Sequence, residues 1–80
     1  MNKQIIECVP NISEGRDINK INSIANVVKT VEGVKLLDID PGKATNRTVI
    51  TFVGEPKNVI EAAFRLIKKA SELIDMNKHS

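Results

Sequence analysis

The 80-residue sequence predicts a small α+β domain whose elements follow in the order β-α-β-β-α. Three observations predict this class. Apolar residues recur with helical spacing from Val59 to Ile74, β-branched residues fill the run Arg47–Val53, and a Pro-Gly pair divides two strand-like runs. This order is that of a ferredoxin-like split βαβ module that lacks its fourth strand.

The first part of the chain is predicted to form a strand and a helix. Gln4–Val9 is short, rich in β-branched residues and followed by a Pro-Asn pair that breaks regular structure. Asn11–Arg16 is predicted to be a loop, because its Asn, Ser and Gly favour turns. Asp17 is expected to cap a helix that ends before Gly33 and buries one apolar stripe, comprising Ile21, Ile24, Ala25, Val28 and Val31.

The middle of the chain is predicted to form a hairpin with strands at Val34–Asp40 and Arg47–Val53. Asp40-Pro41-Gly42 suits the turn, because Pro supplies the φ of one turn position and Gly the positive φ of the next. Ile50 and Phe52 should share one face of the sheet. The other face is also largely apolar, which indicates that something covers it too; it comprises Val49, Thr51 and Val53.

The last predicted element is a helix that opens near Pro56. Its apolar stripe comprises Val59, Ile60, Ala63, Leu66, Ile67, Ala70, Leu73 and Ile74. Residues 1–80 are interpreted as one incomplete domain. The edge of Gln4–Val9, beside which a ferredoxin-like module carries its fourth strand, is expected to be bare. Because bare edges recruit strands, another copy or another protein is expected to pair there.

The composition argues against several classes of function. A formal charge of +2 is too small to indicate binding to nucleic acid or to an anionic membrane. An RNA-recognition module shares the element order but carries several stacking aromatics on its sheet, where only Phe52 is expected here. No apolar run reaches the roughly 18 residues of a membrane span, and no signal peptide is apparent, so a cytoplasmic location is expected.

Few side chains are candidates for chemistry. Asp38 and Asp40 alternate with apolar residues and should share a face, where they could bind a cation or, for Asp40, only shape a turn. Arg47, beside Asn46, could hold a carboxylate with its planar fork or be a solvated residue at a strand start. Cys8 is expected to be a small packing residue, and no metal site is expected.

Three stretches resemble a known family, namely ECVPNISEG (Glu7–Gly15), LLDIDPGKATNRTVITFVGEP (Leu36–Pro56) and LIDMNKHS (Leu73–Ser80). They resemble the N-terminal subdomain of glutamate formimidoyltransferase, also found as the formiminotransferase domain of formiminotransferase-cyclodeaminase. The resemblance runs from about Ile6 to the last residue without gaps. It implies transfer of a formimino group from N-formiminoglutamate to the co-substrate tetrahydrofolate, in histidine degradation and one-carbon metabolism.

The resemblance also implies roles for particular residues. Asp40 would stabilise the positive charge of the tetrahedral intermediate, and Arg47 would bind a carboxylate of either substrate. Loop residues would supply further hydrogen bonds to substrate or folate, namely Asn11, Ser13, Glu14 and Asn46. The catalytic histidine is expected beyond residue 80, since His79 resembles a different histidine that shortly precedes it.

Two functional hypotheses follow from the sequence. In the first, the chain is the N-terminal portion of a glutamate formimidoyltransferase and is inactive alone, because it lacks the catalytic histidine. In the second, it is a stand-alone, non-catalytic module that binds a small anionic ligand or a partner. In either case a homo-oligomer is expected, through the open strand edge or through the dimer of the family.

Overall fold

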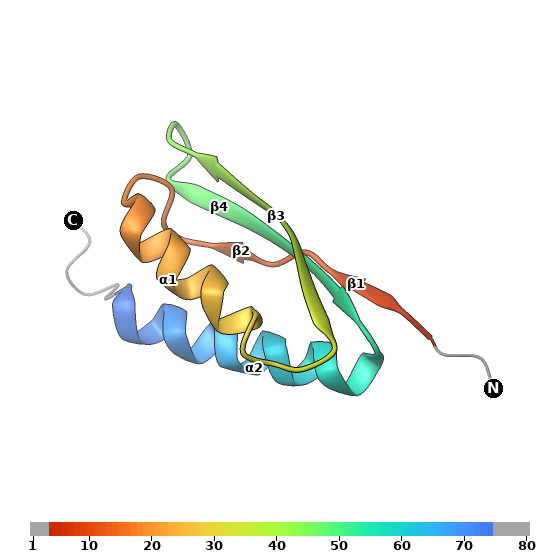
Figure 1. Cartoon of the computed structure of the whole chain (residues 1–80). Coiled ribbons are helices and arrows are strands. Elements are labelled where there is room, and N and C mark those ends of the chain that lie inside the picture. The colour runs from red at the N-terminus through yellow and green to blue at the C-terminus, as the bar shows by residue number, and fades with distance from the viewer. Residues whose placement is uncertain (1–3, 75–80) are drawn as a thin grey trace.

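The computed structural model describes residues 4–74 and shows an α+β domain with two layers (Figure 1). A small antiparallel sheet of four strands forms one layer, and two helices cover one of its faces. The elements are β1 (Ile6–Cys8), β2 (Asn11–Ile12), α1 (Ile18–Val28), β3 (Val34–Gly42), β4 (Arg47–Gly54) and α2 (Pro56–Leu73). The predicted α+β class is confirmed, and the chain has one strand more than the predicted order β-α-β-β-α, because the short β2 follows β1.

Strand β4 is the centre of the sheet, because every other strand pairs with it. β3 pairs with β4 from end to end, so β1 and β2 share the other side of β4. Cys8 lies opposite Phe52 and Asn11 lies opposite Val49, in one unbroken register. The prediction of a loop from Asn11 onward is therefore wrong at its start. Pro10 interrupts the ladder because it has no N–H to donate, and pairing then resumes.

The core lies between the sheet and the two helices. Ile50 and Phe52 point from β4 toward the helices and are fully buried, which confirms the predicted alternation along this strand. α1 is capped as predicted, since the Asp17 carboxylate accepts the N–H groups of Asn19 and Lys20. The helices add the remaining buried side chains, including Ile21, Ile24, Ala25 and Val28 from α1 and Val59, Ala62 and Leu66 from α2.

Helix α1 ends at Val28, earlier than the predicted end before Gly33. The hydroxyl of Thr30 donates to the carbonyl oxygen of Val27 (2.6 Å), which satisfies one of the acceptors that a helix leaves free at its C-terminus. Val31 is nevertheless buried, as predicted, but from the connection to β3 and not from the helix. Gly33 has a φ of 84°, which favours glycine at this turn.

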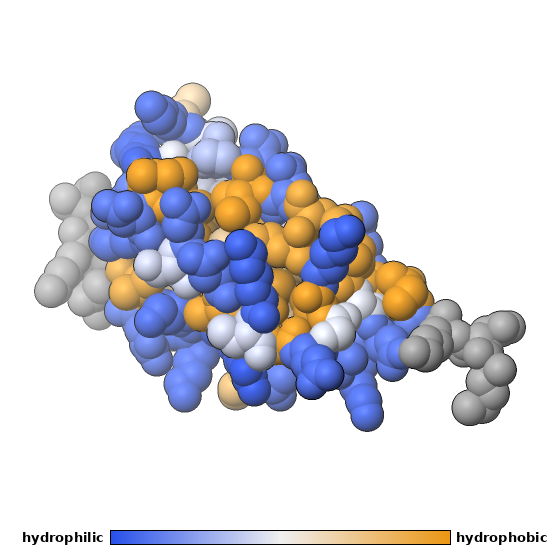
Figure 2. All heavy atoms as spheres, viewed as in Figure 1, coloured by the Kyte–Doolittle hydropathy of each residue, from blue (hydrophilic) through white to orange (hydrophobic). Residues whose placement is uncertain are grey.

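The predicted buried stripe of α2 is only partly correct. Ile60 and Ile67 are 66% and 65% exposed, and Phe64 is 65% exposed beside them. Ala62, which the stripe omitted, is fully buried. The apolar arc of α2 is thus wider than the part of the helix that the sheet and α1 cover. Figure 2 shows hydrophobic residues reaching the surface between charged ones on the helix-bearing side.

The predicted turn at Asp40-Pro41-Gly42 is wrong. These residues continue β3, and Pro41 lies opposite Thr48. Proline is tolerated there because β3 is an edge strand that needs no donor on its open side. The chain turns instead over residues 43–46, where the Asn46 N–H bonds to the Lys43 carbonyl (3.3 Å) and Asn46 adopts a φ of 53°. Asparagine tolerates this left-handed conformation better than most residues.

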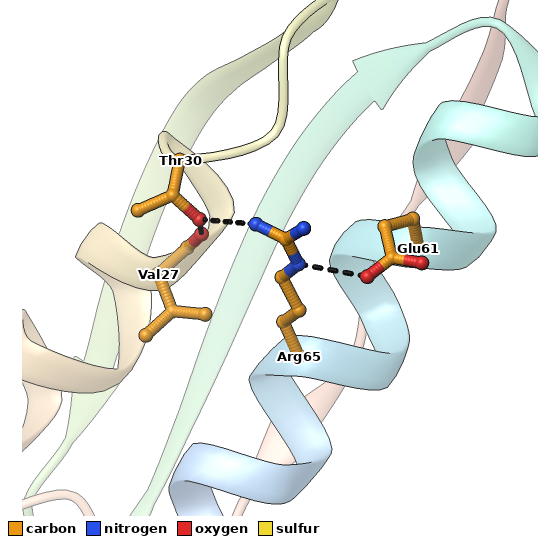
Figure 3. Close-up of polar contacts among 4 residues, drawn as sticks. All are labelled: Val27, Thr30, Glu61 and Arg65. Atoms are coloured by element: carbon orange, nitrogen blue, oxygen red, sulfur yellow. Dashed lines mark hydrogen bonds and ion pairs between the residues drawn. The ribbon is translucent and has the colours of Figure 1, made fainter.

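Arg65 joins α2 to the end of α1 on the outer surface (Figure 3). Its Nε contacts the Glu61 carboxylate at 2.7 Å, and its Nη1 donates to the Thr30 hydroxyl at 3.1 Å. Because these groups are exposed, we expect the ion pair to add less than about 1 kcal/mol to stability. The helices therefore depend mainly on their buried faces for packing.

Candidate functional site

The sheet face that the helices leave uncovered carries three of the predicted site residues. Asn11 and Asp40 both lie opposite Val49, one on each side of β4, so the three residues form a row across the sheet. Adjacent strands are about 4.8 Å apart, which places Asn11 and Asp40 about 10 Å from each other. Arg47 lies two residues before Val49 and projects from the same face.

This outer face combines charge with a partly apolar surface. Val49, Thr51 and Val53 are half-buried on it, whereas Asn11, Asp40 and Arg47 are exposed. Asp38 lies opposite Thr51 and shares the face with Asp40, as predicted. A β-bulge between Leu36 and Asp38 adds one residue to β3 at this point. The face thus offers carboxylates, a guanidinium and an apolar strip to a ligand.

The loop between β2 and α1 is fastened to the start of β4 by side chains that flank Arg47. The Asn46 carboxamide oxygen accepts the Gly15 N–H at 3.0 Å, and the buried Thr48 hydroxyl donates to the Glu14 carbonyl. We call these four residues, Glu14, Gly15, Asn46 and Thr48, the loop junction. Its effect is to hold the exposed Arg47 between two anchored neighbours.

Gly15 is essential to the loop junction because no side chain fits there. A Cβ at this position would lie 2.5 Å from the carbonyl oxygen of Gly42 and 2.6 Å from the amide nitrogen of Arg47. Both are backbone atoms, so neither can rotate away. The absence of a Cβ therefore lets this loop approach the ends of β3 and β4 to backbone contact.

The buried Glu14 carboxylate stabilises the same loop from within. Its Oε2 accepts the backbone N–H groups of Asp17 (3.0 Å) and Arg16 (3.2 Å). The hydrogen bond from Asp17 lowers the pKa of Glu14 below its ordinary value of 4.5, helped by Arg16 and Lys20 and opposed by burial. The carboxylate is thus held by the chain itself as an anion.

The structure separates the predicted site residues into two groups. Exposed side chains available to a ligand belong to Asn11, Ser13, Asp40 and Arg47. Glu14 and Asn46 instead bond to the backbone of the loop junction. His79 lies outside the described residues. Within residues 4–74, no group of three or more His, Cys, Asp or Glu side chains could hold a metal ion, and no helix is long and apolar enough to cross a membrane.

Sequence reasoning did not identify Gly15 and Thr48 as important. A signal for Thr48 was present, because it alternates with Ile50 and Phe52 and so faces the core, where a hydroxyl needs a partner. Gly15 gave no such signal, since a glycine in a polar loop fits an ordinary turn equally well.

Comparison with known proteins decides the family. Residues 5–80 match the family described as "Formiminotransferase domain, N-terminal subdomain". The chain belongs to the formiminotransferase family. It is 53% identical over 79 residues to a formimidoyltransferase-cyclodeaminase of Dictyostelium discoideum and 50% identical over 76 residues to that of Mus musculus. It is 47% identical over 75 residues to a glutamate formimidoyltransferase of Thermoplasma acidophilum.

These formiminotransferase relatives are much longer than this chain. The matches cover 99%, 95% and 94% of the chain but only 14%, 14% and 25% of the respective relatives. The residues of the outer face and of the loop junction all lie within the matched region. The candidate site therefore lies within the part of the chain that matches the N-terminal subdomain.

Replacing Gly15 with alanine is expected to destabilise the fold by about 2–3 kcal/mol, the cost of forcing a side chain into a filled space. Urea unfolding followed by circular dichroism would measure it. Gly42→Ala is the matched control, because its added Cβ would meet the flexible Thr45 hydroxyl at 3.0 Å and no backbone atom closer than 3.4 Å. Equal losses in the two variants would contradict the close approach at Gly15.

Replacing Glu14 with glutamine is expected to cost about 1–2 kcal/mol at pH 7, because the two backbone donors lose a charged acceptor. Since the pKa of Glu14 is lowered on folding, its contribution is complete above about pH 4.5 and is lost as the pH falls through the folded value. Unfolding free energies of the two proteins should therefore converge in acid. A constant difference from pH 7 to pH 3 would refute the role of the anion.

Proposed function

We propose that the chain supplies one wall of a site that transfers a formimino group from N-formiminoglutamate to tetrahydrofolate. Membership of the formiminotransferase family supports a group-transfer reaction. The names of the relatives specify a formimidoyl group as the group transferred and, in one relative, glutamate. The observation that carries the proposal is the row of Asn11 and Asp40 across the uncovered sheet face, with Arg47 beside it. In this proposal a second subdomain forms the opposite wall.

The residues present suit the two substrates. Both carry carboxylates, for which the planar guanidinium of Arg47 is a fitting partner. The half-buried side chains of Val49 and Val53 give a flat ring system an apolar surface next to that charge. Asn11 is exposed on this face, and Ser13, two residues later, is exposed where it lines the groove beside α2; both could donate or accept hydrogen bonds.

Asp40 is proposed to act by electrostatic stabilisation. A nitrogen of tetrahydrofolate attacks the amidine carbon, a C–N bond forms, and the resulting tetrahedral species carries nitrogen-centred positive charge. A fixed carboxylate beside this cation stabilises it most once the site excludes water. Collapse breaks the bond to the glutamate nitrogen, which leaves with a proton. The proton-transferring histidine is proposed to lie beyond residue 80, as the family resemblance implies.

Glu14 and Asn46 are proposed to serve this site through the loop junction. Their side-chain oxygens bond to backbone N–H groups of the loop that carries Ser13. By fastening that loop to the strand that carries Arg47, they would hold both binding residues in one arrangement before a substrate arrives. This preorganisation reduces the ordering cost of binding.

We further propose that the fold is ferredoxin-like and that the protein works in the cytoplasm. β1 and β3 each run antiparallel to β4, which lies between them, so β1, α1 and β3 form a split βαβ unit. The side of β1 and β2 away from β4 is where such a fold carries its fourth strand. The alternative function is that of a stand-alone, non-catalytic binding module. Such a module would use the exposed charges of the outer face to bind a ligand without any transfer reaction.

The purified 80-residue chain is expected to show no turnover of N-formiminoglutamate with tetrahydrofolate, because one wall of the site and the general acid–base histidine are missing. Loss of such a group alone removes about 10²–10⁴-fold of rate. Spectrophotometric assay at high protein concentration would measure this. Turnover at the rate of a full-length relative would show that residues 1–80 contain a complete site.

In a full-length relative, asparagine at the position of Asp40 is expected to lower kcat by about 10²-fold or more, with a smaller change in KM. The reason is that the carboxylate is proposed to act on charge that develops only in the transition state. The equivalent replacement of Asp38, the neighbouring carboxylate on the same face, is the control and should change kcat far less. An unchanged kcat for the first variant would remove Asp40 from the mechanism.

A further inference from the structure

We infer that Asp38 binds the pterin ring of tetrahydrofolate and thereby determines the direction in which the two substrates lie on the outer face. Its two carboxylate oxygens accept the 2-amino group and the N3–H of the ring as a bidentate pair. The inference rests on the proposed function, because it assigns the two ends of that same site. The order of the residues along the sheet, their charges and the shape of the pterin support it.

Asp38 and Arg47 lie on opposite sides of the row that contains Asp40 and Val49. Asp38 is opposite Thr51 on β4, whereas Arg47 belongs to β4 itself, and Val49 lies midway between these two positions of the strand. Neighbours on one face of a strand are about 7 Å apart, so Asp38 and Arg47 each lie about 7 Å along the sheet from this row. The proposed position of the reaction is therefore flanked by a carboxylate on one side and a guanidinium on the other.

The Asp38 carboxylate is available to a ligand. The side chain is exposed, and within residues 4–74 it has no hydrogen-bond or ion-pair partner. The Glu14 carboxylate, in contrast, accepts two backbone N–H groups of its own loop. The β-bulge between Leu36 and Asp38 brings Asp38 to the outer face, and bulges often direct a side chain in this way beside an active site.

The shape of the pterin matches the spacing of the two aspartates. N5 belongs to the reduced ring, whereas the lone pair of N10 is delocalised into the benzoyl group, so N5 is the better nucleophile. The 2-amino group and the N3–H lie on the other of the two fused rings. With N5 beside Asp40, the length of the fused rings brings these two donors to a carboxylate about 7 Å further along the strand, which is where Asp38 lies.

The charges favour one orientation of the substrates over the reverse. The carboxylates of N-formiminoglutamate are attracted to Arg47 and repelled by Asp38. In the reverse orientation these carboxylates would face Asp38, and the two N–H donors of the pterin would face the guanidinium of Arg47, which also only donates. Such mispairing disfavours the reverse orientation, so the order of charges along the face gives specificity.

The surface next to Asp38 suits a flat ring. A pterin whose edge contacts both aspartates of β3 would lie over the adjacent strand, where Val49 and Thr51 are half-buried. Beyond them, in the unbroken register of β1 and β2, Val9 lies opposite Thr51 and is 48% exposed. The ring would therefore cover apolar surface while its polar edge reaches Asp38.

Glu7 is the other exposed carboxylate of this face, and it lies too far away for the same role. It is opposite Val53, four residues along β4 from Val49, and β4 separates it from β3. Strand geometry therefore places Glu7 about 17 Å from Asp40, well beyond the length of two fused rings. Within residues 4–74, Asp38 is thus the carboxylate of the outer face that a pterin beside Asp40 can reach.

The test uses a full-length relative that carries aspartate at the positions of both Asp38 and Asp40. Asp38→Asn is expected to weaken tetrahydrofolate binding by about 10- to 100-fold, because the new NH₂ group faces a donor of the ring. Isothermal titration calorimetry without N-formiminoglutamate measures this Kd independently of the transfer step. The KM for N-formiminoglutamate should change by less than about 2-fold, since its carboxylates lie at the other end of the site.

Two further variants serve as controls. Glu7→Gln removes the same charge from the same face and should leave the Kd for tetrahydrofolate within about 2-fold of its original value. Arg47→Lys should show the reverse of Asp38→Asn, with a raised KM for N-formiminoglutamate and an unchanged Kd for tetrahydrofolate. A larger loss of tetrahydrofolate binding in either control than in Asp38→Asn would overturn the inferred orientation.

An analogue of tetrahydrofolate without the 2-amino group tests the contact itself. The unaltered relative should bind it about 10- to 100-fold more weakly than tetrahydrofolate, because one carboxylate oxygen loses its donor. Asp38→Asn should discriminate far less between the two ligands. Equal binding of both ligands by the unaltered relative would overturn the inference without any variant.

The outcomes also separate this inference from the proposed function. An unchanged Kd in Asp38→Asn, together with a slow Asp40→Asn enzyme, would overturn the role of Asp38 and leave the proposed function standing. Failure of the unaltered relative to bind tetrahydrofolate would instead refute the proposed function, and the role of Asp38 with it.

Discussion

Contact between the loop before α1 and the adjoining ends of β3 and β4 organises the functional half of this molecule. At Gly15, where no Cβ would fit, this loop touches the backbone of Gly42 and Arg47. Asn46 and Thr48 bond to the loop on either side of that contact. Because these side chains flank Arg47, the path of the loop and the position of the guanidinium are set together. The entry into α1 depends on the same contact through the Glu14 carboxylate.

Most of the fold could be predicted from periodicity, and two of the errors share one physical source. Both helices and both hairpin strands follow from local patterns, as does the Asp17 cap. The predicted turn at Asp40-Pro41-Gly42 was wrong because these residues suit a turn as well as the end of a strand. Pairing of Pro41 with Thr48 across the sheet decides for the strand. The predicted burial of Ile60 and Ile67 was wrong because a helical pattern does not show how much of the apolar face a neighbouring element covers. Both errors concern tertiary contacts that no local pattern encodes.

The candidate site was predictable in part for the same reason. The shared face of Asp38 and Asp40 could be predicted from alternation, whereas the row that Asp40 forms with Asn11 needs the order of strands in the sheet. Burial is unexpected for a carboxylate in a polar loop such as that of Glu14. It is explained by the backbone N–H groups of Arg16 and Asp17, which donate to this carboxylate. Whether a polar side chain is available to a ligand or instead stabilises a loop thus depends on whether backbone N–H groups lie within its reach.

The bulge in β3 determines which face of the sheet carries Asp38 and Asp40. Leu36 faces the core opposite Phe52, yet Asp38, two positions later, faces outward opposite Thr51, because Leu37 is an extra residue. If β3 kept Leu37 but lacked the bulge, Leu37 would pair with Thr51, both aspartates would point beneath the helices and Ile39 would point outward. Deleting Leu37 would instead remove the bulge and keep Asp38 opposite Thr51, so both aspartates would still point outward. The outward position of the two carboxylates thus depends on agreement between the length of β3 and the presence of the bulge.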